Sequence, residues 1–543
     1  MLAEAFSQLV QGVPADPEAR LVIEFVFADP LAPDTVEARI RAALPAVEVA
    51  VRTAFEGETD RFHFATFAGI VSEGREALAF EFARALRPAI GALEANPVLT
   101  DSLYGAAAIG AGDAESFASL CETPRENTMP LGWVHPLIRT PEAWQDSTGS
   151  GVTVAVIDTG HSTHQELAGA IRQQGQRNFV EGGTDASDRF VSGFLKHPGH
   201  GTLVCSVIAS RGGADASGGV SGPGAITGSA PEATILPIRA IASVISFRQD
   251  TVAPAIAHAI NEGADVIAMA LGGPTRVAAT EWALRQAVDR GLVVVCAAGN
   301  CWPKVVFPAA YATNRLCTAV AALNRTLTPW DKTGSGPEVT ISAPGVNVWG
   351  AAKNKASDPD HGIRAAQGTT LATSLTAGAA ALWVARHGGR AALRQKAAAA
   401  GTTVQAMFVH CLTQGLVPPP VWGGSGKLGA GLLDTARLLA NPLPSGTEAP
   451  PAADLPDPGV LPSLAVLQDH LANHDPEALS EVGPEMADYA AEVIWLSHRA
   501  AARARAAETE GVAESIVSPD PVSPGLAANL AGKPALRAVL RQP

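Results

Sequence analysis

The stretch Gln367-Gly-Thr-Thr-Leu-Ala-Thr-Ser-Leu-Thr-Ala-Gly378 carries the strongest structural signal in the chain. A Gly-Thr pair ends a polar loop, and an Ala-rich apolar run over 377–385 follows at once. This pattern predicts a sharp turn that leads into a buried helix. Thr370 falls at the start of that helix, where backbone N–H groups have no partner within the helix. A hydroxyl placed there can attack a carbonyl and leave the resulting oxyanion beside free donors.

A second informative stretch is Gly151-Val-Thr-Val-Ala-Val-Ile-Asp-Thr-Gly160. Its Val-rich run, bounded by glycines, predicts a buried strand of a parallel sheet. Asp158 ends that strand, at the edge where α/β sheets place their sites. A lone Asp at a strand end is also a common helix cap, so this residue alone does not decide the function.

Strands and helices alternate through the middle of the chain. The apolar runs at 233–238, 265–271 and 292–298 predict strands, and the segments 202–209, 253–261 and 280–290 predict helices. Such a rhythm is typical of a parallel sheet with helices on both faces. We therefore expect an α/β fold.

Taken together, four motifs resemble those of the subtilisin-like serine proteases (subtilases). Gly368 to Gly378 resembles the nucleophile motif, with Thr370 at the position of the usual Ser. The Asp-Thr-Gly that begins at Asp158, the His-Gly-Thr that begins at His200 and the Ala-Ala-Gly-Asn that ends at Asn300 resemble the other three. Asp before His before the nucleophile is the subtilase order, unlike that of chymotrypsin or the α/β-hydrolases.

The resemblance implies roles for these residues. Asp158 would orient His200, which would act as general base and then acid, and Asn300 would donate to the developing oxyanion. The segment Ala270, Leu271, Gly272 and Gly273 resembles the one whose backbone pairs with an extended substrate; an ordinary glycine turn after a strand is the alternative. The expected partner is a protein or peptide substrate.

Thr370 leaves two functions open. Its hydroxyl keeps the reaction available, but its methyl group restricts χ1, and known Thr nucleophiles usually rely on their own N-terminal amine as base. The chain is therefore either an endopeptidase with an Asp-His-Thr triad or a pseudoprotease that binds peptides without turnover. Ser374 lies one turn further along the helix, and we expect it only to replace the family's Pro.

The remaining segments predict the domain organisation. The pattern over 1–105 is βαββαβ, a ferredoxin-like order, and resembles a subtilase prodomain that could act as an intramolecular inhibitor; a generic α+β accessory domain is the alternative. The last segment, 463–543, could bind a partner or form a solvated appendage. We expect a prodomain-like unit at 1–105, a linker at 106–132, a three-layer subtilisin-like domain at 133–440, a Pro-rich linker at 441–462 and a small helical extension at 463–543.

Composition excludes several classes of partner. The net charge of −14, without a long basic cluster, argues against nucleic acid and anionic membranes. We see neither a secretory signal nor an apolar window of about 18 residues, so the default location is cytoplasmic. The six cysteines form no CxxC pair and are expected to be reduced and mostly buried. We predict no cofactor and commit to no metal, because no dense acidic loop is present.

Overall fold

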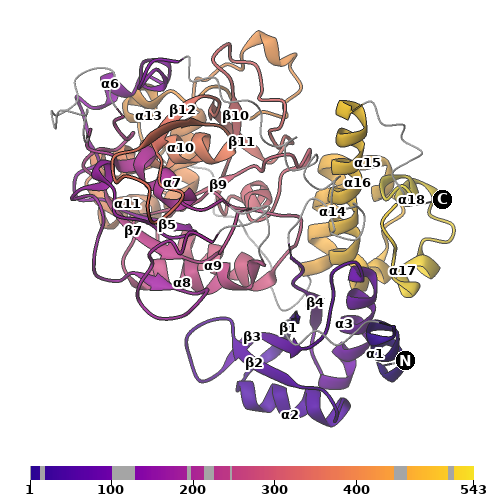
Figure 1. The fold of residues 1–543 in the computed structure, drawn as a ribbon. Helices are drawn as coiled ribbons and strands as arrows, with labels where there is room; N and C mark the ends of the chain where they lie inside the picture. The colour runs from indigo at the N-terminus through magenta and orange to yellow at the C-terminus, as the bar shows by residue number, and fades with distance from the viewer. Residues whose placement is uncertain are drawn as a thin grey trace.

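The computed structural model describes three units of the chain, with gaps between and within them (Figure 1). We call residues up to 100 the N-terminal unit, 129–445 the central unit and 462–542 the C-terminal module. Most of the two predicted linkers, at 106–132 and 441–462, lies outside the described residues. The described ranges are 2–12, 19–100, 129–191, 197–212, 226–244, 248–445, 462–510 and 519–542.

The central unit is built on a seven-stranded sheet in the order β11-β10-β9-β8-β5-β7-β6. Every pairing in this sheet is parallel, which confirms the predicted α/β class. The strands are β5 (Thr153–Asp158), β6 (Arg177–Asn178), β7 (Thr234–Arg239), β8 (Val266–Met269), β9 (Val293–Ala297), β10 (Thr318–Leu323) and β11 (Val339–Pro344).

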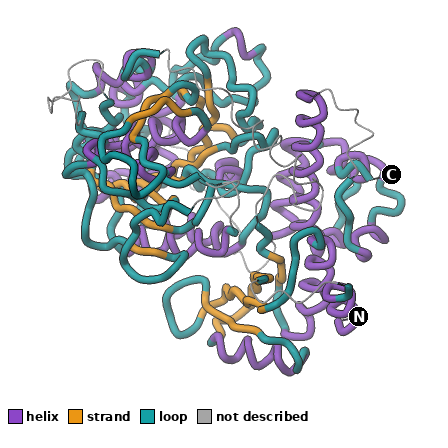
Figure 2. Tube along the Cα trace, viewed as in Figure 1, coloured by secondary structure: helices purple, strands orange, loops and turns teal. Residues whose placement is uncertain are grey.

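Helices cover both faces of the sheet and make it the middle of three layers (Figure 2). Successive side chains of a strand point to opposite faces, and β5 shows the consequence. Ile157 packs in the same core as α8 and α9, whereas Val156 packs with α7, α10 and α12. The helices are α5 (Val134–Leu137), α6 (Thr140–Ala143), α7 (His200–Ala209), α8 (Val252–Asn261), α9 (Ala278–Asp289), α10 (Thr369–Arg386), α11 (Gly389–Ala399), α12 (Val404–Thr413) and α13 (Thr435–Ala440). A hairpin of β12 (Val348–Ala351) and β13 (Ile363–Ala366) precedes α10.

Helix α10 is buried from Thr369 through Val384, as its Ala-rich sequence predicts. Small side chains let it approach its neighbours closely. At Gly378, an added Cβ would lie 2.5 Å from the side chain of Ser229, so only glycine fits at that position.

The N-terminal unit contains an antiparallel sheet in the order β2-β3-β1-β4. Two helices connect its strands, so the elements follow the order βαββαβ. One helix at the start of the chain has no counterpart in the sequence analysis; its Phe6 packs on Phe82, with ring centroids 5.6 Å apart. Whether this unit serves as a prodomain stays a prediction. The elements are α1 (Leu2–Val10), β1 (Arg20–Leu31), α2 (Pro33–Ala43), β2 (Val49–Thr53), β3 (Asp60–Ala68), α3 (Glu76–Ile90) and β4 (Glu94–Pro97).

The C-terminal module is helical, as predicted, but it is not a solvated appendage. Its buried residues, among them Leu471, Val493 and Trp495, belong to a core that continues into the N-terminal and central units. Among the described residues, no helix combines the length and apolar character needed to cross a membrane. The module comprises α14 (Pro462–His474), α15 (Pro476–Leu479), α16 (Ala490–Glu510), α17 (Pro524–Asn529) and α18 (Pro534–Val539).

Candidate active site

Asp158 and His200 meet at the carboxyl end of the central strand. Asp158 is the last residue of β5 and is fully buried. Its Oδ1 accepts a hydrogen bond from the backbone N–H of Thr159 (2.7 Å). The same oxygen lies 2.8 Å from Nδ1 of His200, the first residue of α7. A carboxylate can only accept, so this contact places the proton on Nδ1 and leaves Nε2 as the acceptor.

Thr370 lies on the other side of the imidazole. Helix α10 begins at Thr369, so Thr370 is in its first turn. The Thr370 Oγ1 is 3.2 Å from Nε2 of His200. The structure thus brings together the three predicted triad residues, which are far apart in the sequence, and each is at most 6% exposed.

Asn300 is held against the start of the same helix. Its Oδ1 accepts hydrogen bonds from the backbone N–H of Thr369 (2.8 Å) and from the Thr369 hydroxyl (2.7 Å). With Oδ1 used in this way, the Nδ2 group is oriented to donate elsewhere. Gly368 has φ of 139°, and an added Cβ would lie 2.8 Å from Nδ2 of Asn300, so glycine is required beside this amide.

The residues that orient His200 include one that sequence analysis missed. Asp188 is buried, and its Oδ2 accepts from the Thr159 hydroxyl (2.8 Å) and from the backbone N–H of Gly199 (2.8 Å). The Thr159 hydroxyl oxygen in turn accepts from the N–H of Gly201 (3.1 Å). This network fixes the entry into α7 and therefore the position of His200. Asp188 belongs to no motif, and the only available signal was an acidic residue in the loop before the His-Gly-Thr motif.

Ser374 does not face the imidazole. Its hydroxyl donates to the backbone carbonyl of Thr370 (2.8 Å) and is fully buried. This is the local bond that serine commonly makes in helices, and it agrees with the expectation that Ser374 only replaces Pro.

The predicted substrate segment follows β8 directly. Ala270 and Leu271 are buried. The N–H and carbonyl of Gly273 both bond to the backbone of Phe307, at 3.0 and 2.9 Å. The backbone of Gly273 is therefore already paired. At Gly272 an added Cβ would meet the Val306 side chain at 2.6 Å, so Val306 fills the space beside this glycine.

One cysteine differs from the expectation of reduced thiols. Cys301, next to Asn300, is disulfide-bonded. Spacing could not reveal this bond, because a disulfide joins residues that need not be close in sequence. The other described cysteines are free and buried, as expected; they are Cys205, Cys296, Cys317 and Cys411.

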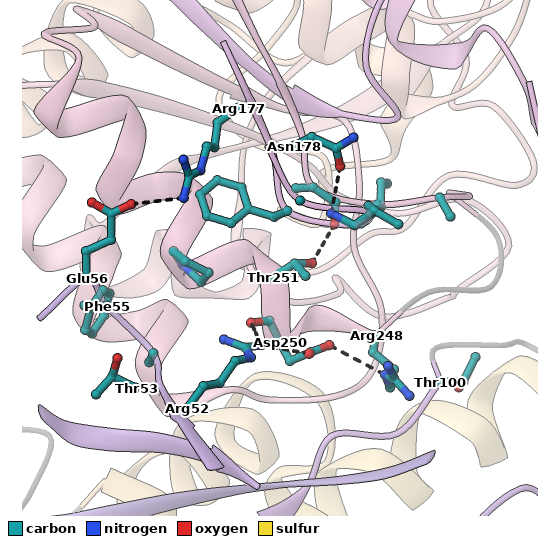
Figure 3. Close-up of a pocket in the computed structure, with 18 residues that line it drawn as sticks. Arg52, Thr53, Phe55, Glu56, Thr100, Arg177, Asn178, Arg248, Asp250 and Thr251 are labelled. Carbon is teal, nitrogen blue, oxygen red and sulfur yellow. Dashed lines mark hydrogen bonds and ion pairs between the residues drawn. The ribbon is translucent and has the colours of Figure 1, made fainter. Parts of the chain in front are cut away.

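A cavity of about 680 Å³ lies between the N-terminal and central units (Figure 3). Its charged groups pair across the boundary: Arg52 with Asp250 at 2.9 Å and Arg177 with Glu56 at 3.5 Å. None of the triad residues lines it. The described side chains also contain no group of three or more His, Cys, Asp or Glu that could hold a metal ion.

Comparison with known proteins identifies the family. The model of the Subtilase family matches residues 149–420. Subtilisin Savinase of Lederbergia lenta is 33% identical over 236 residues, which cover 43% of this chain and 77% of that protein. Thermitase of Thermoactinomyces vulgaris is 31% identical over 266 residues, 49% of this chain and 85% of that protein. The crystal structure of MycP1 with the N-terminal propeptide removed matches with 25% identity and a TM-score of 0.44, covering 60% of this chain and 100% of that chain. The chain belongs to the subtilase family of peptidases, with a central unit of the subtilisin fold.

Proposed function

We propose that the protein is an endopeptidase that hydrolyses peptide bonds through an acyl-enzyme on Thr370. The observation that carries this proposal is the unbroken polar line from Asp158 through His200 to Thr370, with contacts of 2.8 and 3.2 Å. Protein or peptide chains are the proposed substrates, as expected for a member of a peptidase family.

The reaction follows from the positions of the groups. As Oγ1 of Thr370 bonds to the carbonyl carbon, its proton passes to Nε2 of His200, and Asp158 stabilises the imidazolium. The carbonyl oxygen becomes an oxyanion, to which Nδ2 of Asn300 donates. The C–N bond then breaks and the amine takes the proton from His200. Water attacks the ester in the same way and releases Thr370.

Threonine makes this reaction slower than serine would. The extra methyl group restricts χ1, and at 5% exposure the side chain has little room to turn. In subtilisin, loss of the nucleophile costs about 10⁶ in turnover. We place the activity of Thr370 between that floor and the rate of a serine enzyme.

Labelling with a fluorophosphonate probe tests the proposal. We expect slow labelling that peptide mapping places on Thr370, no labelling of Thr370→Ala, and faster labelling of Thr370→Ser. Thr370→Ala also controls for reaction of the probe with other hydroxyls. If Thr370→Ser reacts and the unchanged chain does not, the machinery is intact and the threonine does not act as a nucleophile.

That last outcome would support a second function, a pseudoprotease that binds peptides. The observation favouring it is Thr370 itself, because every other member of the proposed machinery has the family's residue type. The segment 270–273 would bind a peptide in either case, through the backbone of Ala270 to Gly272, since Gly273 is already paired.

The N-terminal unit is proposed to act as an intramolecular inhibitor. Support comes from Glu24, whose carboxylate accepts from the backbone N–H groups of Ala278 (2.8 Å) and Ala279 (2.7 Å) at the start of α9. These two bonds join β1 to the first turn of α9, and α9 closely follows the segment 270–273. An active chain should cut itself between about 105 and 133, which intact mass after purification would reveal. Probe labelling should then accelerate when the N-terminal unit is removed.

A further inference from the structure

The C-terminal module is anchored to the central unit beside the candidate active site. Lys304, four residues after Asn300, donates to the hydroxyl of Ser497 (2.6 Å) and pairs with Asp475. Oε1 of Glu338 lies 2.8 Å from Nε2 of His474. These contacts are mostly shielded from water, so they fix the module in one position.

Aromatic rings complete this anchor. The imidazole of His498 stands edge-on to Trp302 and Phe307, with centroids 6.2 and 6.3 Å away. His470 lies 5.0 Å from His498 on its other side. Burial lowers the pKa of both imidazoles well below the ordinary value, so they remain neutral beside Lys304.

The same module also packs on α3 of the N-terminal unit, which lies below it in Figure 1. The two terminal nitrogens of Arg87 bond to the two carboxylate oxygens of Asp488, at 2.6 and 2.8 Å. The guanidinium of Arg84 lies over the ring of Tyr489, 4.4 Å from its centroid. A two-point Arg–carboxylate contact specifies orientation as well as affinity.

Apolar packing accompanies these charged contacts. Phe80 of α3 and Trp495 of α16 are both nearly buried, with ring centroids 5.9 Å apart. The backbone N–H of Gly525 donates to the carboxylate of Glu81 (3.0 Å). The surface therefore has a buried aromatic centre and a polar rim, which is the anatomy of a specific interface.

All three units meet at a single side chain of the central unit. Arg276 is almost fully buried and contacts Glu94 of the N-terminal unit (3.1 Å), Ser463 of the C-terminal module (3.3 Å) and Glu281 of its own unit (3.3 Å). The Ser463 hydroxyl also donates to Glu94 (2.8 Å). Removing the N-terminal unit would leave this guanidinium with one carboxylate partner instead of two.

We propose that the C-terminal module is a retaining surface whose partner is the N-terminal unit of the same chain. If the chain is cut between residues 100 and 129, the N-terminal unit stays bound, because it contacts two surfaces of the remaining chain. One surface is α9, where Glu24 binds, and the other is the module. Two linked surfaces hold a ligand far more tightly than either alone. This retention does not depend on whether Thr370 turns over substrate.

The test uses the full chain with Thr370→Ala, so that no self-cleavage occurs, and with a recognition sequence for a site-specific protease inserted between residues 100 and 129. After cleavage, the N-terminal fragment should co-elute with the remainder on gel filtration. Asp488→Arg places two cations together, and we expect the dissociation rate of the fragment to rise about tenfold or more. Combining it with Arg87→Asp should restore slow dissociation.

A matched control is Glu485→Arg, which breaks the pair with Lys533 (2.8 Å) inside the same module and should leave the rate unchanged. A second variant, Tyr489→Ala, removes the ring beneath Arg84 and should also speed release. The proposal is wrong if the fragment leaves the unmodified remainder at once. It is equally wrong if both Asp488→Arg and Tyr489→Ala release the fragment no faster than the control. Either failure would leave the proposed role of Thr370 untouched, since every variant in this experiment carries Thr370→Ala.

Discussion

This molecule contains two buried polar clusters that differ in which units supply their residues. The first is the line of Asp158, His200 and Thr370, which comes entirely from the central unit and ends at a hydroxyl. The second surrounds Arg276 and draws one partner from each unit. The first cluster ends in a hydroxyl beside an imidazole, whereas the second joins a buried guanidinium to a partner in each of the three units. Buried polarity therefore joins the three units at the second cluster, whereas the first is the cluster that we propose for reaction.

The largest expected effect breaks the first cluster. His200→Ala removes the proposed base, and the rate of probe labelling should fall by about 10⁴ or more, as for loss of one member of a serine triad. A time course of probe labelling for the two proteins would measure this change in rate. Retention of the N-terminal unit should not change, and a parallel loss of retention would show that the two clusters are not separate.

Breaking the second cluster should act on stability instead. Arg276→Met keeps the volume but leaves Glu94 buried without its cation, while Glu281 keeps only Arg285 (2.6 Å), so the free energy of unfolding should fall by about 3–5 kcal/mol. Arg139→Ala is the control, because it breaks a more exposed pair with Asp434 at 3.0 Å and should cost much less stability than Arg276→Met, since water screens exposed pairs. Urea denaturation would compare them; equal losses would contradict a special role for the junction.

A smaller change in labelling rate is expected from Asn300, which lies beside the first cluster. Asn300→Ala removes the proposed oxyanion donor and should lower labelling or turnover by about 10²–10³. Because Asn300 also accepts two bonds from Thr369, some of this loss could come from a displaced helix start. Asn300→Asp keeps the acceptor oxygen, removes the donor and adds a negative charge beside the oxyanion, so it should be at least as slow as Asn300→Ala if donation is what matters.

The smallest effect concerns pH at the interface of the N-terminal unit. Burial raises the pKa of Glu24 from 4.5 to about 7 in the assembled protein. The assembled state then binds an extra proton between pH 4.5 and 7, so retention should weaken as pH rises through that window, by at most about tenfold per pH unit, and level off above it. Dissociation rates of the cleaved fragment at pH 5, 6, 7 and 8 would measure this. Glu24→Gln should remove the part of the slope due to this group, and an identical slope in that variant would rule Glu24 out.

What the sequence could predict follows from how local each feature is. Asp158, Asn300 and Thr370 lie where a strand or helix begins or ends, and short glycine-containing motifs mark such places. Their meeting was predicted from the resemblance of the four motifs, in their order, to those of the subtilases; the carboxyl end of a parallel strand as a usual place for a site supported only Asp158. That Ser374 only replaces the family's Pro was also predictable, because it depends on local structure: its hydroxyl bonds to a carbonyl one helical turn away.

Features that depend on packing between units could not be predicted. Nothing near Arg276 in the sequence shows that Glu94 and Ser463, 182 and 187 residues away, would meet it. Asp188 acts through a loop without a motif, and the Cys301 disulfide has no spacing signal. Of the two alternatives for the C-terminal extension, the solvated appendage is wrong, and the sequence could not exclude it because a helical pattern does not reveal which surface its apolar side covers.

The contact between Trp302 and His498 has a practical consequence for producing this protein. A chain shortened to end at residue 445 would uncover Trp302, Phe307 and Lys304, which follow Asn300, the proposed oxyanion donor, in the sequence. We expect such a product to aggregate. If it stays in solution, we expect the side-chain amide of Asn300 to be displaced, so that its activity would not represent that of the full chain. Expression boundaries chosen by family similarity alone would therefore discard part of the packing that supports the loop after Asn300.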